Sequence, residues 1–75
     1  MPDLSQLSGR EVLRALERLG FRQTRQRGSH VVMKKVVGDN IRGCVVPMHR
    51  RVALGTLMGI LKQAGVSRAE FESEL

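Results

Sequence analysis

The fold is decided by the middle of the chain, residues 21–47, which reads FRQTRQRGSHVVMKKVVGDNIRGCVVP. Three segments of this stretch lack a helical period and consist of residues that strands favour or tolerate. The predicted strands span residues 21–27, 30–37 and 41–46. Gly28-Ser29 and the 38–40 segment supply the turns, and Pro47 ends the third strand because proline cannot donate to a strand ladder. Consecutive strands with such short turns predict an antiparallel meander.

Amphipathic helices are predicted on both sides of this meander. Apolar residues recur at helical spacing over residues 9–19 and again over 52–64. Gly20 and Gly65 follow these runs, at the position where a left-handed helix end favours glycine. Capping boxes, in which a Ser precedes a Glu by three residues, occur at Ser8–Glu11 and Ser67–Glu70. The second box predicts a short last helix that runs to Leu75.

The order α-β-β-β-α predicts an α+β fold, in which a three-stranded antiparallel sheet carries the helices on one face and leaves the other face open. A chain of 75 residues has the length of one domain, so we expect residues 1–75 to fold as a unit. Gly55 and Gly59 resemble a membrane-helix dimer motif, but their segment is too short and too closely flanked by charge to span a bilayer. We therefore expect these glycines to let the helix pack closely on the sheet.

Positive charge is concentrated in the middle of the chain. The sequence has 13 Lys and Arg against 7 Asp and Glu, a net charge of +6, and Asp39 is the single acid between Arg18 and Lys62. Such a chain attracts polyanions, so nucleic acid is the leading partner and a membrane surface the second. The alternative is that the charge serves solubility alone. The only Phe, Tyr or Trp residues are Phe21 and Phe71, so RNA would be held by Arg, Lys, His and backbone amides rather than by stacking.

Cysteine and histidine are too few for several classes of protein. Cys44 is the single cysteine, so the chain forms no internal disulfide, and it is expected to fill space in the core. One Cys and two His fall short of the four ligands of a structural zinc site. We therefore expect neither a metal nor a small-molecule cofactor.

Four short motifs, in order along residues 8–67, resemble the HicA family of toxins. They are Gly28-Ser29-His30-Val31-Val32, Val46-Pro47-Met48-His49, Gly55-Thr56-Leu57 and Ile60-Leu61-Lys62-Gln63-Ala64-Gly65, after a leading helix that ends in Gly20-Phe21. The first is similar to the Gly-Ser-His that opens the family's second strand, and the second to its strand exit Val-Pro-x-His. The chain departs from the family where Leu54 replaces a common proline before Gly55, and where the 38–40 turn lacks the common Asp-Gly.

The resemblance implies a double-stranded-RNA-binding-domain-like fold, in agreement with the predicted order of elements. It implies the activity of an mRNA interferase, a small cytoplasmic endoribonuclease of a type II toxin–antitoxin system that a HicB antitoxin holds silent. The functional histidine of the family corresponds to His30. The alternative is a non-enzymatic RNA-binding module of the same fold, while the three central strands disfavour a helical DNA-binding protein.

RNA can be cleaved without a metal when its own 2′-hydroxyl attacks the adjacent phosphate, with one group taking a proton and another giving one. Histidine suits either role because its charge changes between about pH 5 and 8. We expect His30 to be this catalytic acid or base, exposed at a strand end after the Gly28-Ser29 turn. The residues expected to bind RNA are Arg27, Gly28, Ser29, Lys34, His49 and Arg50.

His49 has two interpretations. The 38–40 turn places residues near 30 opposite residues near 48 and 49, so both histidines should lie at the same end of the hairpin. The two could form an acid–base pair. The favoured interpretation is instead that His49 caps or orients the start of the second helix.

Other cations are interpreted by the face on which they lie. Lys34 shares a strand face with His30, whereas Lys35 points to the opposite face, so the two lysines cannot serve one site. Arg51 is a further candidate to contact phosphate. Arg10, Arg14 and Arg18 recur every four residues along the first helix. This stripe could follow phosphates, but we interpret it as a solvated face.

Overall fold

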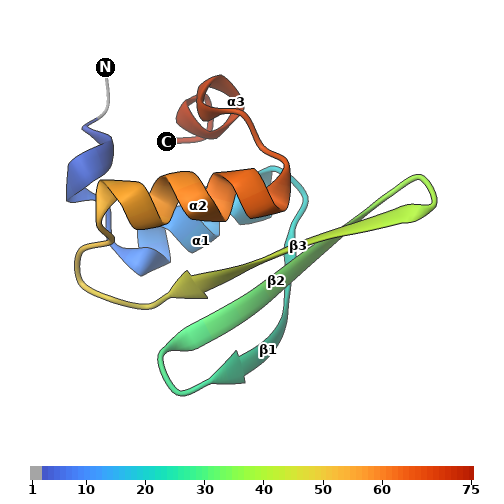
Figure 1. Cartoon of the computed structure of the whole chain (residues 1–75), viewed down its shortest axis with the longest axis horizontal. Coiled ribbons are helices and arrows are strands. Elements are labelled where there is room, and N and C mark those ends of the chain that lie inside the picture. Colours follow the sequence, from blue (N-terminus) through green and yellow to red (C-terminus); the bar gives the residue numbers. More distant parts are fainter. Residues whose placement is uncertain (1–2) are drawn as a thin grey trace.

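The chain forms a helix, a three-stranded meander and two further helices, in the predicted α+β order (Figure 1). The computed structural model describes residues 3–75. The elements are the 3-10 turn η1 (Leu4–Gln6), α1 (Gly9–Arg18), β1 (Arg22–Arg27), β2 (His30–Val37), β3 (Asn40–Pro47), α2 (Leu54–Ala64) and α3 (Arg68–Glu72). None of the helices within the described residues is long and apolar enough to cross a membrane.

The sheet has the order β1-β2-β3, and both strand pairs are antiparallel. His30, the first residue of the central strand β2, lies between Arg27 of β1 and Pro47 of β3. The other end of the β2–β3 hairpin extends beyond the helices (Figure 1). Val36 and Ile41 pair in that extension and remain 71% and 68% exposed. The end that carries His30 therefore lies near the body of the domain.

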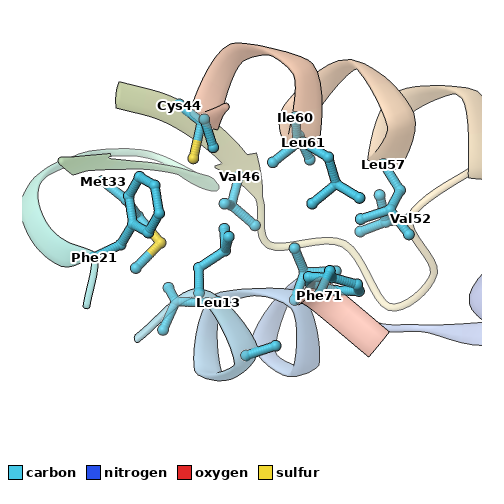
Figure 2. Close-up of a cluster of buried hydrophobic side chains, with 14 of the residues drawn as sticks. Leu13, Phe21, Met33, Cys44, Val46, Val52, Leu57, Ile60, Leu61 and Phe71 are labelled. Atoms are coloured by element: carbon cyan, nitrogen blue, oxygen red, sulfur yellow. The ribbon is translucent and has the colours of Figure 1, made fainter. Parts of the chain in front are cut away.

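The helices cover one face of the sheet. Val31 and Met33 of β2 pair with Val46 and Cys44 of β3, and these four side chains are buried on the same face because side chains alternate along a strand. Residues of α1, α2 and α3 pack on them in a single cluster, in which Phe71 of α3 is fully buried (Figure 2). The opposite face is open, as predicted.

The predicted caps are confirmed. In both capping boxes the serine hydroxyl accepts a hydrogen bond from the glutamate N–H, and the glutamate side chain accepts one from the serine N–H; the pairs are Ser8–Glu11 and Ser67–Glu70. Gly65 closes α2 with a φ of 68°, and Gly20 follows α1 with a φ of 99°. Both glycines take the left-handed conformation that suits them.

The boundaries of five elements differ from the prediction. Two of the changes are a single residue: α1 ends at Arg18 rather than Leu19, and β1 begins at Arg22 rather than Phe21. Helix α2 begins two residues later, because Val52 is buried in the preceding loop and donates its N–H to the Leu7 carbonyl over 2.8 Å. Helix α3 ends at Glu72 rather than Leu75, since the last residues form tighter bonds such as that from Leu75 N to the Glu72 carbonyl. Strand β3 gains one residue at each end and includes Pro47 as its last member.

The interpretation of the glycine pair in α2 is wrong. Gly55 and Gly59 lie on the exposed side of the helix, and a Cβ on either would meet no atom within 4 Å. The face of α2 that packs into the core carries Leu57, Ile60 and Leu61 instead (Figure 2). Close helix–sheet packing therefore does not require either glycine.

Candidate active site and RNA-binding surface

His30 opens the central strand directly after a tight turn. Gly28 in that turn has a φ of 55°, which glycine adopts without strain, and Gln26 Nε2 donates to the Gly28 carbonyl over 3.0 Å. A Cβ on Gly28 would meet no atom within 4 Å, so the surface beside the turn is open. The side chain of His30 is itself exposed, as expected for a strand end.

His49 lies beside His30, two residues after the end of β3. The ring centroids are 6.1 Å apart and the ring planes are inclined by 76°. Met48 N donates to the Ser29 carbonyl over 2.6 Å, and Gly9 N donates to the His49 carbonyl over 2.9 Å. These backbone contacts tie the His49 loop to the turn before β2 and to the start of α1. The prediction that both histidines lie at one end of the hairpin is confirmed.

His49 does not cap the second helix. The N-cap residue of α2 is Ala53, and no side chain forms a cap hydrogen bond there. The His49 side chain is exposed, and its imidazole makes no hydrogen bond within residues 3–75. The capping interpretation is therefore wrong. The group of His49 that orients the loop is its backbone carbonyl.

Some of the basic residues hold carbonyl groups of the fold. Lys35 Nζ donates to the Leu19 carbonyl at the end of α1 over 2.6 Å, and Arg42 donates to the Gly65 carbonyl at the end of α2 over 3.0 Å. A cation is favourable at each place because the last carbonyls of a helix lack partners within it. Lys35 thus lies on the helix side of the sheet, away from His30, as predicted.

Three other cations, which lie beside the histidines or on the same sheet face as His30, do not hold a backbone carbonyl group of residues 3–75. Arg27 pairs with His30 across the strands and shares its open face. Arg50 is exposed next to His49, and Lys34 lies on the His30 face of β2, roughly 13 Å from His30 at 3.3 Å per residue. Within the described residues, none of these three cations makes a side-chain hydrogen bond or ion pair. The predicted RNA-binding residues therefore gather at one end of the sheet, except Lys34, which lies further along it.

Arg10 also lies at the end of the sheet that carries the histidines, a position that the sequence did not predict. It borders a shallow concavity at the start of α1, where no carboxylate contributes. The residues that line the concavity are Ser8, Arg10, Met48, His49 and Arg50. The arginine stripe of α1 is not uniform, since Arg18 at the far end of the helix donates to the Glu74 carbonyl over 2.8 Å. No local pattern marked Arg10, because its position depends on the packing of α1 against the end of β3.

A second open hollow joins His30 to α2. The residues that line it are His30, Val45, Pro47, Thr56, Gly59, Ile60 and Gln63. Thr56 and Gln63 thus border the same hollow as His30, and they add a hydroxyl and an amide to its rim. The sequence did not predict that Thr56 and Gln63 line this hollow. Helical periodicity identifies the polar side of α2, but it does not determine which end of the sheet that side faces.

Cys44 is buried, and burial raises the pKa of its thiol to about 11, so the thiol stays protonated near neutral pH. Within residues 3–75, no three His, Cys, Asp or Glu side chains lie together as a metal site would require. Cys44 fills core space, as predicted.

We expect Gly9→Ala to destabilise the fold, because Gly9 joins α1 to the loop that carries His49. A Cβ at Gly9 would collide with the Pro47 carbonyl oxygen and lie 2.8 Å from Met48 Cα, and both atoms belong to the backbone. Overpacking of this kind costs roughly 1–3 kcal/mol of unfolding free energy. Urea denaturation measures the change.

Gly59→Ala is the matched control for this prediction. It also adds a methyl group to a helical glycine, but into open space. It should therefore raise the free energy of unfolding by about 0.5–1 kcal/mol, the usual advantage of Ala over Gly in a helix. A Gly9→Ala protein that matched the wild type in stability would contradict the close approach of α1 to the end of β3.

Comparison with known families matches most of the chain. The model that describes the HicA toxin of bacterial toxin–antitoxin systems matches residues 9–66. This range includes α1, the whole sheet and α2, and therefore both His30 and His49. A comparison with curated proteins finds no match.

Proposed function

This chain belongs to the HicA toxin family of bacterial toxin–antitoxin systems, and on that premise we propose that it is an endoribonuclease that cleaves mRNA, with His30 as a catalytic acid or base. One observation supports the proposal above the others. His30 is exposed at the end of the central strand, beside cations that have no partner among the described residues, so a phosphate could reach the imidazole without any rearrangement.

The proposed reaction uses the RNA's own nucleophile. The 2′-hydroxyl attacks the adjacent phosphorus, a base takes the hydroxyl proton, and an acid protonates the 5′-oxygen as the bond from phosphorus to that oxygen breaks. Arg27 and Arg50 would stabilise the negative charge that grows on the phosphate oxygens. The open turn at Gly28 and Ser29 would let the RNA backbone approach, and Lys34 would hold a phosphate further along the strand.

The proposed partners are mRNA and a HicB-like antitoxin, both met in the cytoplasm. An exposed site among cations attracts any polyanion, so the toxin needs a partner that covers His30 when it must stay silent. We expect the antitoxin to be acidic where it meets Arg27 and Arg50, because complementary charge speeds capture. No cofactor takes part in this proposal.

Cleavage of a labelled RNA by the purified protein tests the proposal. We expect cleavage to persist in EDTA, since the proposed proton transfers need only side chains, and the products to carry 2′,3′-cyclic phosphate and 5′-hydroxyl ends. Mass spectrometry of the fragments identifies those ends. Loss of cleavage in EDTA, with recovery when a divalent cation is added, would contradict the metal-independent mechanism.

A second outcome would point to the alternative function. A protein that binds the RNA but leaves it intact at every salt concentration and pH tested is a non-enzymatic RNA-binding module of the same fold. Expression in bacteria separates the two further. The endoribonuclease should arrest growth, and His30→Ala should relieve the arrest.

A further inference from the structure

His49 lies where a second proton-transfer group for the same phosphate would have to lie. We propose that His49 is a catalytic residue and that His30 and His49 act as an acid–base pair, one taking the proton of the 2′-hydroxyl and the other giving a proton to the leaving 5′-oxygen. The proposal rests on the proposed endoribonuclease function and extends it from one named catalytic group to two.

The separation of the two rings suits a shared phosphate. Their centroids are 6.1 Å apart, and both side chains are exposed. Two hydrogen bonds of roughly 2.8 Å, one to the 2′-hydroxyl and one to the 5′-oxygen of the same phosphodiester, cover a distance of this size. The inclination of 76° is an edge-to-face arrangement, so the two rings do not stack face to face.

The backbone holds both histidines in this arrangement. His30 pairs with Pro47 across the sheet, which fixes the start of β2 against the end of β3. The bond from Met48 N to the Ser29 carbonyl continues that pairing by one step, and the bond from Gly9 N to the His49 carbonyl fixes the loop against α1. The relative position of the rings therefore follows from rigid elements, which a catalytic pair requires.

Among the described residues, the ionisable side chains that line the concavity with His49 or lie beside its ring are basic. Arg10 comes from α1, Arg50 from the loop of His49 itself, and His30 from β2, with Arg27 of β1 beside His30. The carboxylate of Glu11, also on α1, accepts a hydrogen bond from Ser8 N in the capping box. A phosphate placed between the histidines would thus be the main negative group there, and the guanidinium groups would favour the charge of the transition state.

The chemical step balances with these two side chains. The bond from the 2′-oxygen to phosphorus forms as the bond from phosphorus to the 5′-oxygen breaks. One neutral imidazole gains the 2′-hydroxyl proton, and one protonated imidazole gives its proton to the 5′-oxygen. The products are a 2′,3′-cyclic phosphate and a 5′-hydroxyl, and a proton exchanged with water restores the starting pair.

A structural role does not account for the His49 side chain. The ring is exposed, forms no hydrogen bond within the described residues, and does not cap α2. The contact that orients the loop uses the His49 carbonyl, which remains in every substituted protein. His49→Ala should therefore leave the fold intact and remove only the imidazole.

The experiment measures single-turnover cleavage of a labelled RNA across pH by the wild type, His49→Ala and His49→Gln. Lys62→Ala is the control, because it removes an exposed positive charge from α2 that lines neither the concavity beside His49 nor the hollow beside His30. We expect both His49 variants to lose roughly 10²–10⁴-fold in rate and one limb of the pH profile, while RNA affinity and the melting temperature stay near those of the wild type. The control should retain its rate and both limbs.

A substrate with sulfur in place of the bridging 5′-oxygen assigns the two roles. Sulfur leaves without being protonated, so this RNA should restore cleavage to the variant that lacks the acid but not to the variant that lacks the base. Rescue of either His49→Ala or His30→Ala, but not of both, supports the pair.

Three results would overturn the proposal. They are a His49→Ala rate within about threefold of the wild type, retention of the rate by His49→Gln, and rescue of neither alanine variant by the sulfur substrate. If the wild type itself fails to cleave RNA, the proposed function fails first. If the wild type and the His49 variants cleave equally well, the acid–base pair fails alone.

Discussion

His30→Ala should lower the rate of RNA cleavage by roughly 10²–10⁴-fold, the contribution of one positioned proton-transfer group. The side chain is exposed at the end of β2, so its removal leaves no buried cavity and the fold should persist. RNA affinity should change little, because binding rests on several cations rather than on one imidazole. Single-turnover rates, with binding measured separately, distinguish a loss of chemistry from a loss of contact.

Val36→Ala is the matched control for this experiment. Val36 lies on the same strand and the same face as His30 but in the far extension of the hairpin, where it is 71% exposed. Its truncation should leave both cleavage and RNA binding unchanged. A His30→Ala protein that cleaves as fast as the Val36→Ala protein would end the assignment of His30 as a catalytic residue.

The parts of the fold that the sequence predicted well are those that local chemistry encodes. The capping box Ser8–Glu11 and the left-handed Gly65 each satisfy backbone groups at a helix end, so their signals survive without knowledge of the rest of the molecule. The placement of His30 at a strand start followed in the same way from the Gly28-Ser29 turn. Even the prediction that His30 and His49 lie at the same end of the hairpin required only the length of the 38–40 turn.

The features that the sequence did not predict depend on packing between distant elements. Gly55 and Gly59 suggested close packing, but the side of α2 that meets the sheet is set by the larger apolar residues of the helix. The capping role suggested for His49 failed because the segment from His49 to Ala53 is held by contacts with α1 and its preceding loop. Arg10 reaches the site through the same contact of α1 with the end of β3. No local sequence pattern encodes these contacts between distant elements.

Only the structure distinguishes the cations that bind carbonyl groups of the fold from the cations that remain available to a ligand. Lys35 and Arg42 add to the net charge of +6, yet each is bound to a carbonyl at the end of a helix. Composition counts them with Arg27 and Arg50, whose side chains hold no partner within residues 3–75. The charge that a polyanion meets is therefore a subset of the formal charge, and Arg10, Arg27 and Arg50 of that subset lie at the histidine end of the sheet.

This subset predicts that RNA binding falls steeply with salt. Arg10, Arg27, Lys34 and Arg50 are exposed and could each neutralise one phosphate. About four such contacts on a single strand give a slope of roughly −3 in log affinity against log salt, so a tenfold rise in salt should weaken binding about 1,000-fold. Fluorescence anisotropy with the His30→Ala protein and a labelled RNA measures the slope without cleavage of the probe.

Two charge variants locate the source of this salt dependence. Arg50→Gln removes one of the proposed phosphate contacts, so it should weaken binding at low salt and reduce the slope by about 0.7. Arg68→Gln removes the same formal charge from α3, where Arg68 Nε donates to Glu72 over 2.9 Å, and it should leave the slope unchanged. Equal effects of the two substitutions would mean that RNA responds to the net charge of the domain rather than to this end of the sheet. A flat salt response in the parent protein would contradict a surface that tracks phosphates.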